Sequence, residues 1–86
     1  MSRRDKPEFA VIGLGRFGSS LALTLAEVGF NVLGVDNNPA VIQAYADQLT
    51  QAVTLDATDE NALRDIDITA FDTVIVSMSQ NFEGTI

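Results

Sequence analysis

The chain has 86 residues, of which 47% are hydrophobic and 20% charged, so we expect one small globular domain. It contains no cysteine and no histidine, which excludes disulfides, thiolate nucleophiles, histidine acid–base catalysis and the usual zinc sites. The formal charge is −7, and three of the five basic residues stand in the first six positions, so the rest of the chain is more acidic still. Such an acidic surface disfavours partners such as nucleic acid or an anionic membrane surface.

The N-terminal region predicts a strand followed by a helix. Residues 1–7 form a polar lead-in, and we place the domain at residues 8–86. Residues 9–12 are a continuous apolar run, typical of a strand buried on both faces of a parallel sheet. Apolar residues then recur at helical spacing, in Phe17, Leu21, Leu25 and Val28. Gly29 stands where the C-cap of that helix would be.

A second strand and helix follow at once. Residues 32–35 form a short apolar strand. Asn38 and Pro39 favour a helix start, because a capping side chain precedes a proline whose fixed φ suits the first turn. The apolar positions of this helix share one face: Ile42, Tyr45, Ala46 and Leu49.

The remaining elements repeat the alternation. Residues 52–55 predict a third strand, and residues 73–76 a fourth. Thr58 is expected to cap the helix between them, whose apolar positions are Ala62, Leu63 and Ile66. The order is β-α-β-α-β-α-β. Because crossovers between parallel strands are right-handed, we expect an α/β, Rossmann-like parallel sheet of order 3-2-1-4 with helices on both faces.

A glycine-rich turn is the strongest functional signal. A GxGxxG pattern follows the first strand and opens a helix, which is the context that makes it specific for a dinucleotide or phosphate. Gly13 allows the tight turn, Gly15 lets phosphate approach the backbone, and Gly18 lets the helix pack closely. The free amides at the helix start face the anion. We therefore predict that the whole segment binds the nucleotide: Gly13, Leu14, Gly15, Arg16, Phe17 and Gly18.

Two polar residues are candidates for the ribose. Asp36 ends the second strand, 18 residues after Gly18, close to the ~20-residue spacing of the ribose-binding acid. Its carboxylate would accept from the 2′- and 3′-hydroxyls and repel a 2′-phosphate, which disfavours NADP. The alternative for Asp36 is a cap of the turn before Asn38. Asn37 either assists with the ribose or forms the turn.

The other candidates surround the same crevice. Arg16 offers a guanidinium to phosphate, and its alternative is a solvated first-turn side chain. Asp56 follows the third strand and either accepts from an adenine amino group or belongs to a capping cluster. The remaining predicted contacts are Ala57, Thr58, Ser77 and Met78.

No catalytic set is visible, so we do not expect an enzyme. The acidic residues lie mostly at predicted helix ends and loops, and the Gly-Lys-Ser/Thr ending of a phosphate-transferring P-loop is absent. Two alternatives to a non-enzymatic binding module stay open. One is the coenzyme-binding half of an NAD-dependent dehydrogenase, and the other is an assembly domain with a vestigial nucleotide site.

Four segments together resemble a known family: residues 9–18, Val35-Asp36, Asp56-Ala57-Thr58 and residues 74–77. They are similar to the N-terminal domain (TrkA-N type) of RCK proteins, the cytosolic regulators of potassium channels and transporters such as the Trk and Ktr systems. The resemblance implies binding of ATP, ADP or NAD(H) at Gly13–Gly18, ribose at Asp36, adenine near Asp56 and phosphate at Arg16, in some members across a dimer interface.

The resemblance also implies partners. Such domains form homo-oligomers, often an octameric ring, beneath a membrane-embedded potassium-translocating subunit, and nucleotide exchange gates ion flow. We therefore expect a cytoplasmic protein with no membrane insertion of its own. Members of the family normally continue with further strands and a crossing helix. The chain is thus expected to be a partial domain that exposes apolar surface and self-associates.

Overall fold

The computed structural model describes residues 7–77. A four-stranded parallel sheet has the order β3-β2-β1-β4, which confirms the predicted topology. The elements that follow one another along the chain are β1 (Glu8–Ile12), α1 (Arg16–Val28), β2 (Asn31–Asp36), α2 (Pro39–Tyr45), β3 (Gln51–Thr54), α3 (Glu60–Asp65), the short 3-10 helix η1 (Ile68–Ala70) and β4 (Thr73–Val76).

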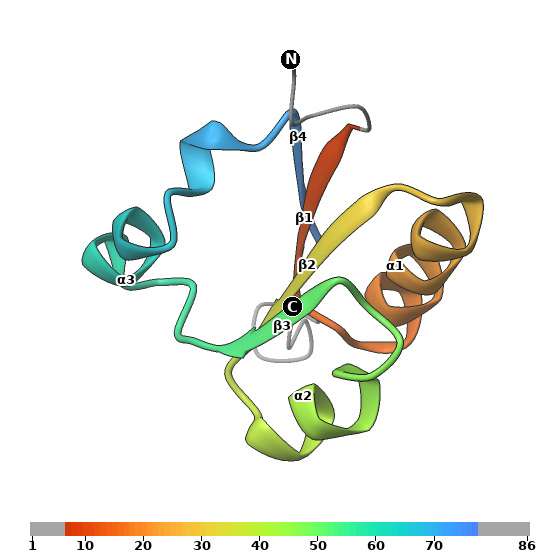
Figure 1. Ribbon diagram of the computed structural model, residues 1–86. Helices are drawn as coiled ribbons and strands as arrows, with labels where there is room; N and C mark the ends of the chain where they lie inside the picture. The colour runs from red at the N-terminus through yellow and green to blue at the C-terminus, as the bar shows by residue number, and fades with distance from the viewer. Residues whose placement is uncertain (1–6, 78–86) are drawn as a thin grey trace, which may run out of the picture.

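The helices cover both faces of the sheet, as expected (Figure 1). On one face, α1 and α2 pack over a cluster that includes Val11 and Val32. On the other face, α3 and η1 pack over a second cluster that includes Ala10 and Val35. Neighbouring strand residues contribute to opposite clusters because side chains alternate along a strand. Both β1 and β2 are therefore buried on two sides, which explains their continuous apolar runs.

The strand register brings the carboxyl ends of all four described strands to one edge. Ile12 at the end of β1 pairs with Val35 of β2 and with Val76 of β4, and Val35 pairs with Val53 of β3. Asp36 ends β2 at this edge, and the connections that follow β1 and β3 carry the glycine turn and Asp56. The sheet thus gathers at one end the polar groups that the sequence disperses over some forty positions.

Helix α1 differs from its predicted packing. Its buried residues are Gly18, Ser19 and Ala22, whereas Phe17 is 69% exposed and Val28 is 64% exposed. The predicted apolar stripe is therefore wrong at both ends. The reason lies at Gly18, where a Cβ would collide with the carbonyl oxygen of Gly13. The helix approaches the sheet most closely at its small residues, while Leu23 and Leu25 pack against the core partly buried.

Two other helices differ in their ends. Helix α2 begins as predicted, with the Asn38 side chain accepting from the amide of Ala40 and Pro39 in the first turn, but it ends at Tyr45. Leu49 lies beyond the helix and is nevertheless buried. Helix α3 is capped by Asp59, whose side chain accepts from the amides of Asn61 and Ala62, so the prediction of Thr58 as the cap is wrong.

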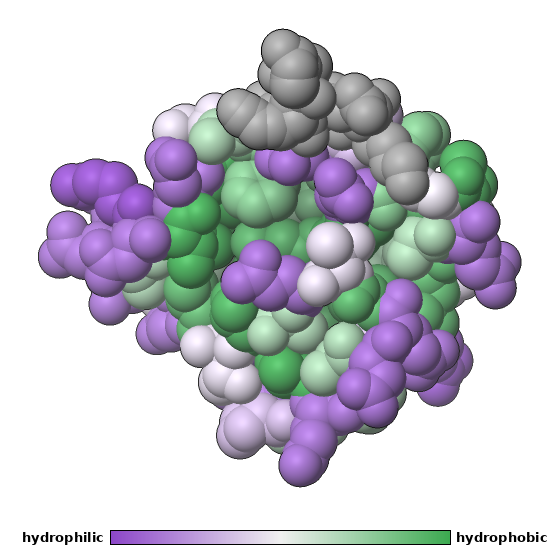
Figure 2. All heavy atoms as spheres, viewed as in Figure 1, coloured by the Kyte–Doolittle hydropathy of each residue, from purple (hydrophilic) through white to green (hydrophobic). Residues whose placement is uncertain are grey.

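The surface of the molecule follows this layering. Hydrophilic side chains gather over the outer side of α3, at the left of Figure 2, where Glu60 and Arg64 form an exposed ion pair of 3.8 Å. Such a pair contributes at most about 1 kcal/mol, so burial of apolar surface against the sheet holds α3 in place. After β4 the polar stretch from Ser77 to Ile86 predicts the entry to a further helix, and residues 78–86 of it lie outside the described residues.

Candidate functional site

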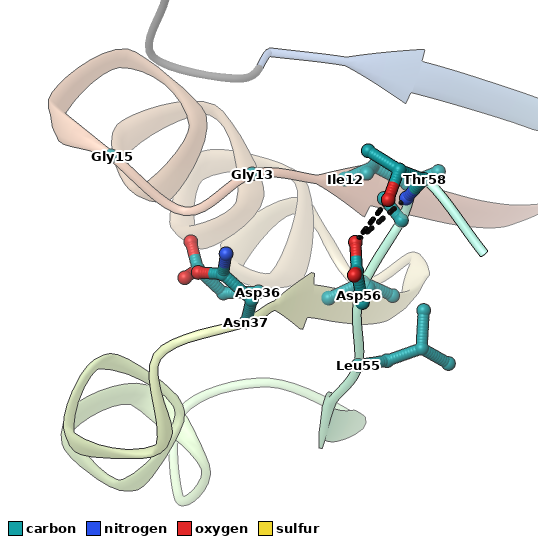
Figure 3. A pocket seen from close by; sticks show the side chains of 10 residues that line it. Ile12, Gly13, Gly15, Asp36, Asn37, Leu55, Asp56 and Thr58 are labelled. Atoms are coloured by element: carbon teal, nitrogen blue, oxygen red, sulfur yellow. Dashed lines mark hydrogen bonds between the residues drawn. The ribbon is translucent and has the colours of Figure 1, made fainter. Parts of the chain in front are cut away.

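A cleft opens at the carboxyl ends of β1, β2 and β3 (Figure 3). Its lining residues come from the last positions of β1 and β2 and from the connections that follow the three strands: Ile12, Gly13, Gly15, Val35, Asp36, Asn37, Leu55, Asp56, Ala57 and Thr58. Most of the residues that the sequence singles out for nucleotide binding therefore lie around one cleft. This edge of a doubly wound sheet, where crossovers reverse direction, is the usual ligand position in such folds.

The glycine turn begins the cleft and is held by the backbone of β2. Gly13 has a φ of 97°, a conformation that favours glycine. Its amide donates to the carbonyl oxygen of Val35 at 2.7 Å. Helix α1 begins at Arg16, and its first intrahelical bond runs from the amide of Ser19 to the carbonyl of Gly15 at 2.9 Å. The amides of the first turn precede that bond and are the helix end that attracts an anion.

Asp36 connects two turns of the site. Its Oδ2 accepts a hydrogen bond from the amide of Leu14 at 2.8 Å, and its Oδ1 accepts from the amide of Asn38 at 2.9 Å. An ionised carboxylate has about four acceptor positions, so two remain for a pair of hydroxyls. The turn-capping interpretation and the ribose interpretation of Asp36 are therefore compatible in one geometry.

Asp56 lies across the cleft from Asp36, in the connection between β3 and α3. Its Oδ1 accepts from the amide of Thr58 at 2.9 Å and from the Thr58 hydroxyl at 2.6 Å. These hydrogen bonds, that of the hydroxyl first, lower the pKa of Asp56 below its ordinary value. The cleft thus presents a carboxylate that stays ionised at neutral pH, an acceptor that suits a ligand amino group.

The remaining predicted residues lie beside the cleft or away from it. The Leu14 side chain is 2% exposed within the core, and its amide is taken by Asp36. Arg16 lines a neighbouring groove between α1 and α2, which shares Gly15 with the cleft. Phe17 points to solvent. Ser77 follows β4, and its amide donates to the carbonyl of Ile12 at 2.7 Å. Met78 lies outside the described residues.

Sequence reasoning missed the apolar part of the lining. Ile12, Val35 and Leu55 stand at the ends of the three strands and line the cleft beside the polar groups. The available signal was their position, since each is the last apolar residue before a predicted binding group. Ile12 and Val35 are buried in the core beneath the cleft, whereas Leu55 is half-buried and leaves apolar surface beside the polar groups.

Residues 7–77 contain neither a candidate metal-binding group nor a helix suited to span a membrane. No three acidic side chains there gather into a group that could hold a metal ion. No helix within the same range has both the length and the apolar character to cross a bilayer.

The chain matches a known protein family over most of its length. A family model described as the TrkA-N domain matches residues 9–86. The chain belongs to the TrkA-N domain family. This agrees with the resemblance carried by the glycine turn and by the Asp56-Ala57-Thr58 step.

Three curated relatives of this TrkA-N domain carry names from potassium uptake. Over 85 residues the chain is 44% identical to "Ktr system potassium uptake protein A" of Bacillus subtilis, covering 99% of this chain and 38% of the relative. It is 42% identical to protein C of the same system over 81 residues, covering 94% and 37%. Protein A of Vibrio alginolyticus is 33% identical over 86 residues, covering 100% and 39%. The TrkA-N domain thus spans less than two fifths of the length of these relatives.

Proposed function

We propose that this TrkA-N domain, residues 8–86, is a regulatory module that binds an adenine nucleotide, either ATP, ADP or NAD(H). The observation that carries the proposal is the convergence of the glycine turn, Asp36 and Asp56 on one cleft. These groups match the three chemical parts of such a ligand: phosphate, ribose hydroxyls and the base. Asp36 disfavours NADP, because its charge would repel a 2′-phosphate.

The names of the relatives support a role in potassium transport. The module then acts in the cytoplasm as part of a homo-oligomer, a dimer or a larger ring, bound to a membrane-embedded potassium-translocating subunit. It performs no chemistry on the nucleotide. Regulation requires that two nucleotides bind the open and closed states of this assembly unequally, because a ligand shifts an equilibrium only by its difference in affinity.

In this proposal each part of the site has one task. The first-turn amides of α1 and the Arg16 guanidinium contact phosphate, Asp36 and Asn37 bind the ribose, and Asp56 faces the adenine. Ala57, Thr58 and Ser77 complete the surroundings of the nucleotide. Leu14 contributes through its amide, which fixes Asp36.

Gly15 provides a direct test. Its φ of −71° is open to any residue, so Gly15→Ala leaves the turn unstrained while placing a methyl group where phosphate would approach. We expect calorimetric titration with ATP, ADP and NADH to show at least a tenfold loss of affinity in this variant. Ser20→Ala, an exposed change on the same helix, is the matched control and should bind normally.

The same titration distinguishes the alternative. Binding of ATP and ADP supports a nucleotide-sensing regulator. Binding of NADH alone would favour the coenzyme half of a dehydrogenase, and equal binding of all nucleotides by Gly15→Ala and the parent chain would remove the glycine turn from the site.

A further inference from the structure

The connection between β1 and α1 carries a single side chain, that of Leu14. Its neighbours Gly13 and Gly15 have none, so the turn is held by backbone bonds and by whatever Leu14 contacts. Leu14 is 2% exposed and belongs to the core cluster on the face of the sheet that α1 and α2 cover. Because removal of a leucine from water is favourable, this side chain anchors the middle of the turn in the core.

Gly34 in β2 provides the space for the anchor. A Cβ at position 34 would lie 2.9 Å from Cδ1 of Leu14 and 2.7 Å from Cδ1 of Leu49. The two leucines therefore approach the same glycine, Leu14 from the glycine turn and Leu49 from the connection between α2 and β3. Position 34 stands two residues before Asp36, which ends the same strand.

The backbone of Leu14 contacts Asp36 itself. Its amide donates to Oδ2 of Asp36 at 2.8 Å, across a separation of 22 residues. Figure 3 shows the Asp36 side chain directed toward the stretch of chain between Gly13 and Gly15. The side chain and the amide of Leu14 thus contact β2 at two positions. If the side chain left the core, the amide would move away from the carboxylate.

This amide decides whether the Asp36 carboxylate can rotate. Oδ1 accepts from the amide of Asn38 at 2.9 Å, so each of the two oxygens has one backbone donor. Without the donor from Leu14, Oδ2 would be free and the carboxylate could turn about its bond to Cβ. A pair of neighbouring hydroxyls needs both oxygens in a fixed plane, because each hydroxyl must find its own acceptor position.

We propose that Leu14 is a positioning residue whose buried side chain holds the glycine turn and, through its amide, orients the Asp36 carboxylate for a vicinal diol such as that of ribose. This rests on the proposed function, in which Asp36 is the ribose contact. Leu14 acts through Asp36, and its side chain does not contact the nucleotide.

The test compares Leu14→Ala with Leu49→Ala. Both changes remove a buried leucine that lies against Gly34, so both should lower the thermal midpoint of unfolding. Only Leu14→Ala removes the anchor of the glycine turn. Leu14→Val and Leu49→Val leave smaller cavities and repeat the comparison in chains that retain most of the core.

Affinities for ATP and for 2′,3′-dideoxy-ATP, which lacks both ribose hydroxyls, are measured by calorimetric titration of each variant. We expect Leu14→Ala to reduce the preference for ATP over dideoxy-ATP about tenfold, the effect of one weakened hydrogen bond to a charged group. Leu49→Ala should keep the preference of the parent chain. A purely structural role for Leu14 would give both variants the same preference.

A second measurement needs no nucleotide. Amide hydrogen exchange, followed by NMR, reports the bond between residue 14 and Asp36. Relative to the amides of β1, the amide of residue 14 should exchange about tenfold faster in Leu14→Val than in the parent chain. Leu49→Val should leave this relative rate unchanged, because its cavity lies outside the turn.

Three results would overturn the proposal. An unchanged relative exchange rate in Leu14→Val would show that the side chain does not hold the turn. Faster exchange with an unchanged preference for ATP over dideoxy-ATP would show that the anchor does not act on the ribose through Asp36. Binding of neither nucleotide by the parent chain, with the exchange effect intact, would remove the proposed function and leave Leu14 an anchor of the turn alone.

Discussion

Asp36 illustrates how one side chain can serve the fold and the ligand together. Its two carboxylate oxygens hold the amides of Leu14 and Asn38, which belong to the turns before α1 and α2. In the proposed function, the ribose would therefore bind to a carboxylate that already fixes the glycine turn. Loss of the carboxylate should loosen the site even without nucleotide.

Asp36→Asn tests this in the ligand-free chain. An asparagine side chain has one acceptor oxygen, so one of the two backbone amides would face an NH2 group in either orientation. We expect a loss of about 1–3 kcal/mol in the free energy of unfolding, measured by urea denaturation. Asn37→Ser, an exposed neighbour on the same cleft, should change little. Equal stability of Asp36→Asn and the parent chain would mean that water replaces these bonds at no cost.

At the scale of elements, the contact between α1 and the β1 turn sets the geometry of the site. Because the Cβ of an alanine at position 18 would meet a backbone carbonyl, the helix would have to move away from the sheet. The first-turn amides of α1, which we propose contact phosphate, would move with it. We expect Gly18→Ala to abolish nucleotide binding and to lower stability by several kcal/mol, which thermal unfolding with and without ATP would measure.

Gly34→Ala is the informative comparison. A Cβ there would lie 2.7 Å from Cδ1 of Leu49 and 2.9 Å from Cδ1 of Leu14, which are ends of flexible side chains. These atoms can shift where a carbonyl cannot, so we expect about 1–3 kcal/mol of destabilisation with nucleotide binding retained. A milder effect at Gly18 than at Gly34 would contradict the close approach of α1.

Strands and their order were predictable from the sequence, whereas helix packing was not. Apolar runs such as residues 9–12 are local signals, and handedness then orders the strands with few alternatives. The exposure of Phe17 depends on the distance between α1 and the sheet, which helical periodicity does not contain. Likewise, Leu49 lies after the end of α2 and is buried because it packs against Gly34.

The residues of the cleft were predictable from their positions at strand ends, whereas the contacts between distant residues were not. Gly13 and Asp56 follow strands and Asp36 ends one, and parallel strands bring such positions to one edge. The bond between the Asp36 side chain and Leu14 joins residues far apart in sequence and carries no local pattern. The same is true of the Arg16 side chain, which the structure places in the neighbouring groove.

At the scale of the whole molecule, β4 is an edge of the sheet with apolar side chains in water. Val76 is 67% exposed, and β4 pairs with β1 on one side only within the part of the chain that is described. Such an edge favours self-association. We expect Val76→Lys to reduce association, measured by sedimentation velocity over a range of concentrations.

Val28→Lys is a control of matched exposure, since Val28 is 64% exposed but lies at the end of α1. If the edge strand drives association, this helix substitution should leave it unchanged. A larger effect of Val28→Lys would instead locate the contact on α1.

The central position of β1 has a kinetic consequence. β1 pairs with β4, the last strand within residues 7–77, Phe9 with Thr73, so this part of the sheet forms only when most of the described residues have folded. Folding with such non-local pairing is slow, and the cleft does not exist before β1, β2 and β3 are aligned. A nucleotide should therefore leave the refolding rate nearly unchanged and slow unfolding, which stopped-flow measurements with and without ATP would resolve. The ligand would then lengthen the lifetime of the folded domain by slowing its unfolding, without accelerating its folding.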